Sequence, residues 1–163
     1  MSSSTSSPNL PPLTPWPPET STWKTYPLHC HCGSIRYNIK ISPPLLPSDD
    51  RKNEGIYTVG ECKCSYCERN GYLSVHPRQE NVEFTQGDDK ITKYWFGRKE
   101  CPHWFCKDCG SVLATDLSKL CEGMGIEKRY TINVRMLKDF DPKRLKIQKM
   151  EFMKDQPPKY EID

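Results

Sequence analysis

Cysteine is the residue type that most constrains this chain. All of its nine cysteines except Cys101 and Cys121 fall into three short groups. The groups are Cys30-His31-Cys32, Cys62-Lys63-Cys64-Ser65-Tyr66-Cys67 and Cys106-Lys107-Asp108-Cys109. In a C-x-x-C segment the backbone can curl so that both thiolates reach one ion at about 2.3 Å, and a C-x-C pair can do the same from a tight bend. The spacing therefore predicts zinc sites.

The two pairs and the triple divide into two sites. We expect a four-thiolate site made by Cys30, Cys32, Cys106 and Cys109. Four protein ligands leave no open position, so this zinc is expected to be structural. The second site takes three ligands from one local segment, namely Cys62, Cys64 and Cys67. Three protein ligands with one open position are typical of a catalytic zinc, so we expect two zinc ions per chain.

Other side chains leave alternatives open. Either Cys101 or His103 could supply a fourth ligand and close the second site, whereas Cys101 and Cys121 are otherwise interpreted as free thiols. Three further histidines are interpreted as structural: His29 and His31 as neighbours of the first pair, and His76 as a surface or core residue.

The cysteines also bear on location. The N-terminus has no apolar signal segment, and no apolar run approaches the roughly 20 residues of a membrane span. We therefore expect a cytoplasmic protein without a membrane partner, in a reducing compartment where thiolate sites are commoner than disulfides. The net charge is +3, and acidic residues interrupt the basic stretch from Lys138 to Lys154. A nucleic-acid partner is therefore not expected.

Composition along the chain suggests one domain with two appendages. Residues 1–22 are rich in Ser, Thr and Pro, which predicts a disordered arm. Residues 155–163 are predicted to form a flexible tail, which leaves 23–154 as the folded zinc domain. The mean hydropathy of −0.78 indicates a small core that metal helps to stabilise.

The folded part is predicted to be mainly β. Alternating apolar and polar residues predict strands at 35–41 and 130–134. Further strands are expected at 56–61, 82–85 and 91–96, the last two joined as a hairpin through the Gly/Asp turn 86–90. Residues 104–105 and 111–115 should flank the last cysteine pair. Helices are expected to be short: one turn after Cys67, and one begun by Asp141-Pro142.

The ordered cysteine motifs resemble a known family. They are Leu28-His29-Cys30-His31-Cys32-Gly33-Ser34-Ile35-Arg36-Tyr37, Cys62-Lys63-Cys64-Ser65-Tyr66-Cys67-Glu68-Arg69-Asn70-Gly71, His103-Trp104-Phe105-Cys106-Lys107-Asp108-Cys109-Gly110-Ser111 and Ile132-Asn133-Val134. Together they resemble the glutathione-dependent formaldehyde-activating enzyme family, which also includes centromere protein V. The resemblance implies a β-tent fold of small antiparallel sheets around the zinc sites, with the structural and catalytic zinc assignments given above.

The resemblance also implies an activity. Its expected reaction is that of a zinc-dependent carbon–sulfur lyase or synthase similar to S-(hydroxymethyl)glutathione synthase, with glutathione as thiol co-substrate and a small electrophile as partner. The alternative is a non-enzymatic zinc module that binds a protein or nucleic acid, as centromere protein V suggests. Candidate catalytic or substrate residues are Tyr66, Arg69 and Asn70. The charged loop Ser42 to Gly55 and Arg135 depart from the pattern expected of the family.

Overall fold

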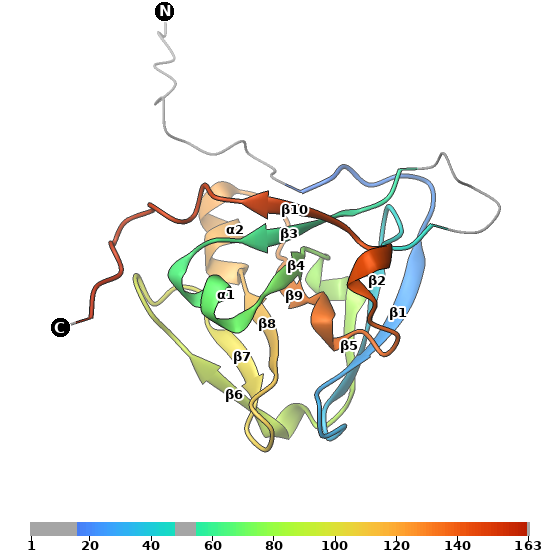
Figure 1. The fold of residues 1–163 in the computed structure, drawn as a ribbon, viewed down its shortest axis with the longest axis horizontal. Coiled ribbons are helices and arrows are strands. Elements are labelled where there is room, and N and C mark those ends of the chain that lie inside the picture. Colours follow the sequence, from blue (N-terminus) through green and yellow to red (C-terminus); the bar gives the residue numbers. More distant parts are fainter. Residues whose placement is uncertain (1–15, 48–54, 163) are drawn as a thin grey trace, which may run out of the picture.

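The computed structural model describes residues 16–47 and 55–162. Most of the predicted N-terminal arm, residues 1–15, and much of the charged loop, residues 48–54, lie outside this part. The strands are β1 (Lys24–His29), β2 (Arg36–Ile41), β3 (Thr58–Cys62), β4 (Leu73–Val75), β5 (Val82–Gln86), β6 (Ile91–Tyr94), β7 (His103–Cys106), β8 (Val112–Asp116), β9 (Tyr130–Asn133) and β10 (Lys146–Met150) (Figure 1). The helices are α1 (Ser65–Asn70) and α2 (Ser118–Met124), with 3-10 turns at Gln79–Asn81, Asp88–Lys90, Val134–Met136 and Pro142–Arg144.

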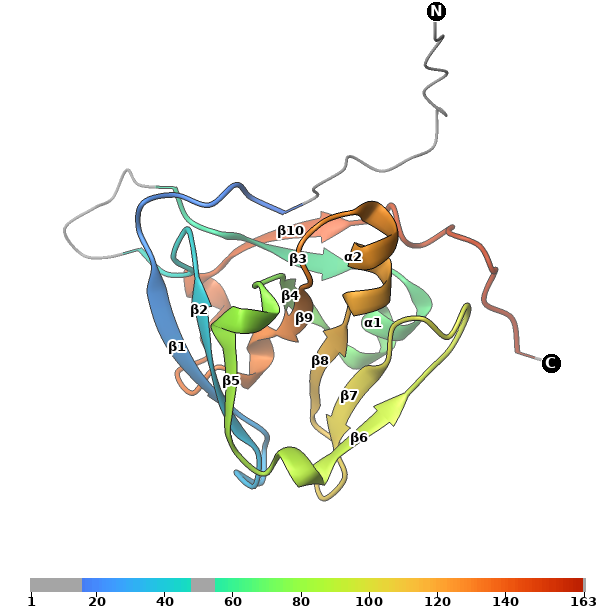
Figure 2. The same cartoon turned by 180° about the vertical axis from the view of Figure 1, so that it is seen from behind.

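These strands form two sheets, which confirms the mainly β prediction. The smaller sheet has the order β1-β2-β5, and the larger has the order β10-β3-β4-β9-β8-β7-β6. Every neighbouring pair is antiparallel except β10 and β3. The two sheets stand at an angle to each other, and the β1–β2 and β7–β8 turns approach at their lower ends (Figure 2).

The predicted alternation at 35–41 is confirmed as β2. Tyr37, Ile39 and Ile41 are buried there, while the residues between them are partly or largely exposed. The sequence did not reveal β1, because Pro27 interrupts the pattern of buried Tyr26 and Leu28. Since β1 is an edge strand, a proline without an N–H donor is tolerated in it.

The predicted hairpin between 82–85 and 91–96 is wrong, although both strands exist. β5 pairs with β2 in the smaller sheet, whereas β6 pairs with β7 in the larger one. The connection runs through the 3-10 turn Asp88–Lys90. Gly87 has φ +75°, and a Cβ placed on it would come within 2.0 Å of the Ser34 carbonyl oxygen. The glycine therefore lets the chain pass close to the smaller sheet and cross to the larger one, instead of folding back.

One of the two predicted helical turns lies where it was expected, and the other begins earlier in the chain. The turn at Pro142–Arg144 is confirmed, and Asp141 caps it by accepting from the Lys143 amide at 3.0 Å. The turn expected after Cys67 begins earlier, because α1 starts at Ser65 and contains Cys67. The sequence analysis did not identify β4, β10 or α2.

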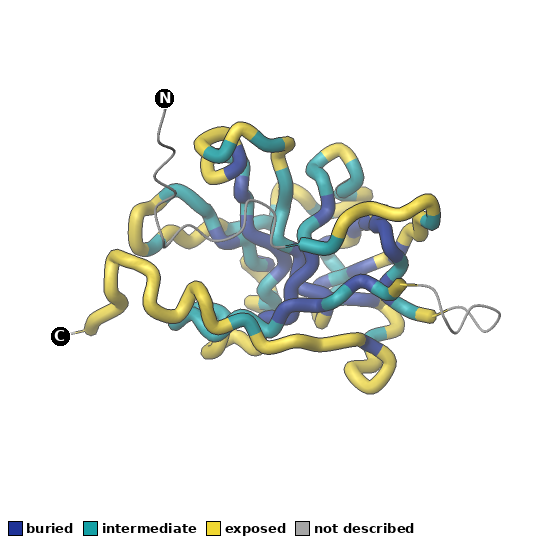
Figure 3. Tube along the Cα trace, turned by 90° about the horizontal axis from the view of Figure 1, so that it is seen from above, coloured by how far each residue is buried: buried dark blue, intermediate teal, exposed yellow. Residues whose placement is uncertain are grey.

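The buried residues gather in the middle of the molecule (Figure 3) and form one apolar core. Its fully buried side chains come from both sheets and include Tyr37 and Ile39 of β2, Leu113 of β8 and Ile132 of β9. The sheets are therefore held together by apolar burial, which drives folding at about 25 cal/mol per Å².

Part of the predicted arm contacts the domain. Trp16 packs against the core, and the Glu19 carboxylate accepts two hydrogen bonds from Arg78 at 2.7 and 2.8 Å. The Thr20 amide donates to Ser42 Oγ at 2.8 Å. The boundary at residue 23 stays a prediction, as does the flexible tail. Within the described ranges, no helix has the length and apolar character needed to span a membrane.

Candidate metal centres

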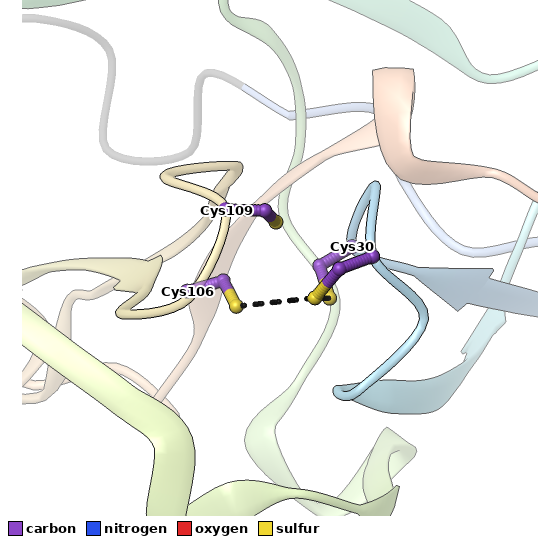
Figure 4. A group of neighbouring side chains, drawn as sticks. Cys30, Cys106 and Cys109 are labelled. Atoms are coloured by element: carbon purple, nitrogen blue, oxygen red, sulfur yellow. Dashed lines mark hydrogen bonds between the residues drawn. The ribbon is translucent and has the colours of Figure 1, made fainter.

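The first cysteine group joins the two sheets. Cys30 and Cys32 lie in the β1–β2 turn, and Cys106 and Cys109 lie at the β7–β8 turn. All four sulfurs are within 4.8 Å of one another. Figure 4 shows Cys30 on one loop facing Cys106 and Cys109 on the other. The structure therefore brings together residues that are more than 70 positions apart in the chain.

The two turns share one backbone design. The Cys30 amide donates to the Ile35 carbonyl at 3.1 Å, and the Cys106 amide donates to the Ser111 carbonyl at 3.0 Å. Gly33 and Gly110 both have φ +75°, a conformation that favours glycine. Each turn is thereby closed with its sulfurs on the inside.

The spacing of the sulfurs fits zinc. Cys30 and Cys32 sulfurs lie 3.5 Å apart, and those of Cys32 and Cys106 lie 3.8 Å apart. Four thiolates at 2.3 Å from a tetrahedral zinc are separated by about 3.8 Å. Ser34 Oγ lies 3.0 Å from Cys32 Sγ, and the Ile35 amide donates to Cys30 Sγ at 3.3 Å. Both contacts come from residues that follow the two cysteines in the same turn.

Polar groups also contact the Cys109 sulfur. Burial raises the pKa of its thiol, but hydrogen bonds from the Ser111 hydroxyl and from the backbone of Cys32 and Ser111 outweigh it and lower the pKa to about 6. The Ser111 hydroxyl lies 3.3 Å from Cys109 Sγ and also accepts from the His31 amide at 3.0 Å. Ser111 therefore links the two turns around the four sulfurs.

The second group is local. Cys62 ends β3, Cys64 is the N-cap of α1 and Cys67 lies within α1. Their sulfurs are also within 4.8 Å of one another, and all three residues are half-buried. Cys64 Sγ accepts from the Cys67 amide at 3.4 Å, in the manner of an N-cap oxygen. The start of the helix thus holds the Cys64 sulfur against the backbone of Cys67.

The pKa values of these three thiols are shifted in different directions. Hydrogen bonds from Cys62 and Cys67 lower the pKa of Cys64, and the same contacts with Cys64 raise the pKa of Cys62 to about 11. Hydrogen bonds with Cys62 and Cys64 also raise the pKa of Cys67. A metal ion bound by the three sulfurs would require their thiolate forms, so binding would release protons.

Cys101 and His103 are the two candidates for a fourth ligand of the second site. Neither Cys101 nor His103 belongs to the three-sulfur group defined by the 4.8 Å limit. Burial raises the pKa of the Cys101 thiol to about 11, which disfavours its thiolate form. His103 Nδ1 is hydrogen-bonded to Thr115 Oγ1 at 2.9 Å. Burial lowers the pKa of His103 to about 4, while the nearby Cys64 opposes that shift.

The candidate substrate residues all lie on α1. The Arg69 guanidinium donates to the Ser65 carbonyl at 2.9 Å, and the Asn70 amide group donates to the Tyr66 carbonyl at 2.9 Å. Both side chains are exposed and pack along their own helix. Tyr66 is half-buried, and its ring centroid lies 4.1 Å from that of His103. Their substrate roles stay predictions.

The remaining histidines do not join either group. His29 Nδ1 is hydrogen-bonded to the Cys30 carbonyl at 2.8 Å. His76 directly follows β4, and burial lowers its pKa to about 4. A surface hollow of about 200 Å³ lies elsewhere, between Glu19 and Arg78, and none of the cysteines lines it.

The sequence analysis missed the aromatic surroundings of Tyr66. Tyr94 and Phe96 stack with it at ring-centroid distances of 5.9 and 5.6 Å. A signal was present, since Tyr94 and Phe96 are two residues apart and therefore lie on the same face of an extended chain. Their distance from Tyr66 in the sequence concealed the contact.

Fold and site together describe a small β protein with two cysteine clusters that could each bind a metal ion. The model of the family described as "Glutathione-dependent formaldehyde-activating enzyme" matches residues 25–154. The chain belongs to this family.

A solved structure of a Rhodobacter sphaeroides protein has a similar fold. The two share 24% sequence identity with a TM-score of 0.52, over 72% of this chain and 92% of that chain. This likeness supports the fold alone. No curated protein matches the sequence.

Proposed function

We propose that this protein is a zinc-dependent carbon–sulfur lyase or synthase that acts on glutathione adducts. The observation that carries the proposal is the difference between the two cysteine groups. One has four sulfurs at tetrahedral spacing, and the other has three half-exposed sulfurs on a strand end and a short helix. We assign a structural zinc to Cys30, Cys32, Cys106 and Cys109, and a catalytic zinc to Cys62, Cys64 and Cys67.

The proposed reaction is the addition of a thiol to a carbonyl compound. When bound, zinc with an open position lowers the pKa of a thiol and so supplies a nucleophile at neutral pH. The glutathione sulfur bonds to the carbonyl carbon, the π pair of the carbonyl moves to its oxygen, and that oxygen takes up the proton that the thiol lost. In the reverse direction the carbon–sulfur bond breaks and the same proton returns to sulfur.

The chain's own residues would hold the reactants close together. Arg69 offers a cation near the three cysteines that could pair with a glutathione carboxylate. Holding two reactants in the right orientation can lower a barrier by about 7 to 11 kcal/mol. The β-tent description, a cytoplasmic location and a relation to centromere protein V belong to the same proposal, and they rest on the motifs and the thiolate-rich composition.

The test is a titration of cobalt-substituted protein with glutathione and then with S-methylglutathione. Entry of a thiolate changes the charge-transfer and ligand-field bands, whereas a thioether is a poorer ligand. We therefore expect glutathione to bind far more tightly and to change the spectrum. Equal affinities with unchanged spectra would contradict the enzyme and favour a non-enzymatic zinc module.

A further inference from the structure

Four aromatic side chains form a continuous surface beside the three-cysteine group. We call this surface the aromatic wall, and it consists of Tyr66, Tyr94, Phe96 and His103. The ring centroids of His103 lie 4.1 Å from Tyr66 and 4.9 Å from Phe96. Tyr94 completes the wall at 5.9 Å from Tyr66 and 5.8 Å from Phe96.

The sheet and its hydrogen bonds fix the rings in place. Tyr94 and His103 are direct cross-strand partners of β6 and β7, so their side chains share one face. Thr115 Oγ1 lies 2.9 Å from His103 Nδ1 and 3.4 Å from the Tyr72 hydroxyl, which donates to the Thr131 carbonyl at 3.1 Å. The inner end of the wall is therefore held by buried groups.

The wall leads from solvent to the cysteines. Its outer ring, Tyr94, is 45% exposed, whereas the inner ring, His103, is 8% exposed. Tyr66 is on α1 and lies between Cys64 and Cys67 in the sequence, so the wall adjoins the three-cysteine group. If a glutathione adduct bound at the three-cysteine group, the substituent carried by its sulfur could contact these rings.

The aromatic area of the wall indicates what kind of substituent it would bind. Formaldehyde contributes a single carbon to its adduct, which would leave most of this aromatic area uncovered. A planar ring could instead stack on the half-exposed rings, and such contacts stabilise beyond simple burial. We infer that the aromatic wall selects glutathione adducts of aromatic aldehydes.

This inference rests on the proposed function and uses the same bond changes. The thiol sulfur bonds to the carbonyl carbon of the aromatic aldehyde, and the carbonyl oxygen takes the proton lost by the thiol. The ring is a spectator that binds the wall. Tyr94 and Phe96 would thus determine specificity without taking part in the bond changes.

The C-terminal segment is the other group that could cover the wall. The Arg69 guanidinium lies over the Tyr160 ring at 5.1 Å, and Pro158 lies beside Gly97. Arg69 is on the same helix as Tyr66, and Gly97 directly follows Phe96 in the sequence. Deletion of residues 155–163 is therefore included in the test.

The experiment measures binding by calorimetry, with the zinc-loaded full chain and two thioether probes. S-benzylglutathione should bind about five-fold or more tightly than S-methylglutathione, since only the benzyl ring can stack. Tyr94→Leu and Phe96→Leu should each remove most of this preference. Trp95→Ala is the matched control, because Trp95 is similarly exposed at 46% and none of the described ring pairs includes it.

Two results would overturn the inference: equal binding of the probes, or a preference that persists in Tyr94→Leu and Phe96→Leu. A preference that emerges only after deletion of residues 155–163 would assign the wall to the tail and also overturn it. Glutathione is measured in parallel on the cobalt protein. If glutathione gives its spectral change while the probes bind equally, only the inference fails; if glutathione gives none, the proposed function fails as well.

Discussion

At the scale of single residues, the sulfur groups depend on small donors next to them. Ser34 and Ser111 place hydroxyls at 3.0 and 3.3 Å from Cys32 and Cys109. At Cys109, hydrogen bonds outweigh the effect of burial and lower the pKa of the thiol to about 6, which favours the metal-binding thiolate. Each loop thus supplies both the ligands and polar groups that contact their sulfurs.

Replacing Cys106 by Ser should release the structural zinc and unfold the domain. The free energy of binding at a structural zinc site is also folding free energy, about 10 kcal/mol or more. Metal analysis and thermal melting by circular dichroism measure both effects. Cys121→Ser is the control, because Cys121 is buried but lies outside both groups, and it should keep two zinc ions. A Cys106→Ser protein that melts like the parent would contradict the closed-site assignment.

At the scale of elements, α1 is short and buries none of its residues. Its C-cap, Gly71, has φ +61°, and the Arg135 guanidinium donates to the Gly71 carbonyl. Arg135, which departs from the expected family pattern, therefore holds the end of the helix that carries Cys67. The helix depends on its caps more than on the core, so changes within it should remain local.

Cys64→Ser should remove the second zinc, leave the first in place and abolish activity. Serine keeps an N-cap acceptor at the start of α1, so we expect the melting temperature of the metal-replete protein to change by only a few degrees. Metal content should fall from two to about one zinc per chain. Cys101→Ser is the matched control and should retain both ions; its loss of the second zinc would mean that the site is closed.

At the scale of the whole molecule, the first cysteine group joins the ends of two sheets that also share a core. The N-terminal segment adds a second link on the opposite side. Trp16 lies 5.0 Å from the His76 ring, and the Arg129 guanidinium lies 5.2 Å from the Trp16 ring. A residue from the predicted disordered arm thus packs on the larger sheet.

Trp16→Ala should therefore destabilise the whole domain by about 1 to 2 kcal/mol, through lost apolar burial and a lost cation–π contact. Chemical denaturation measures this change. Trp23→Ala is the control, since Trp23 is 38% exposed and contacts Lys40 at its surface. Equal stability of Trp16→Ala and the parent would support a folded boundary at residue 23.

The mainly β class and the local cysteine group could be predicted from the sequence alone. Alternation at Tyr37, Ile39 and Ile41 follows from the two-residue period of a strand, and a C-x-C-x-x-C segment is short enough to converge without help from the rest of the chain. The sequence also predicted the family, because the three cysteine motifs can be recognised by their order along the chain.

Strand pairing and the surroundings of the second site could not be predicted from the sequence, because they depend on long-range packing. The Gly87 turn looks like a hairpin in the sequence, yet it crosses between sheets because the chain packs against Ser34 there. Likewise, Tyr94 and Phe96 meet Tyr66 only because β6 pairs with β7 beside α1. Local periodicity shows which face of a strand is apolar. Which strands pair depends on how much apolar surface the whole chain can bury, and a short segment carries no information about that.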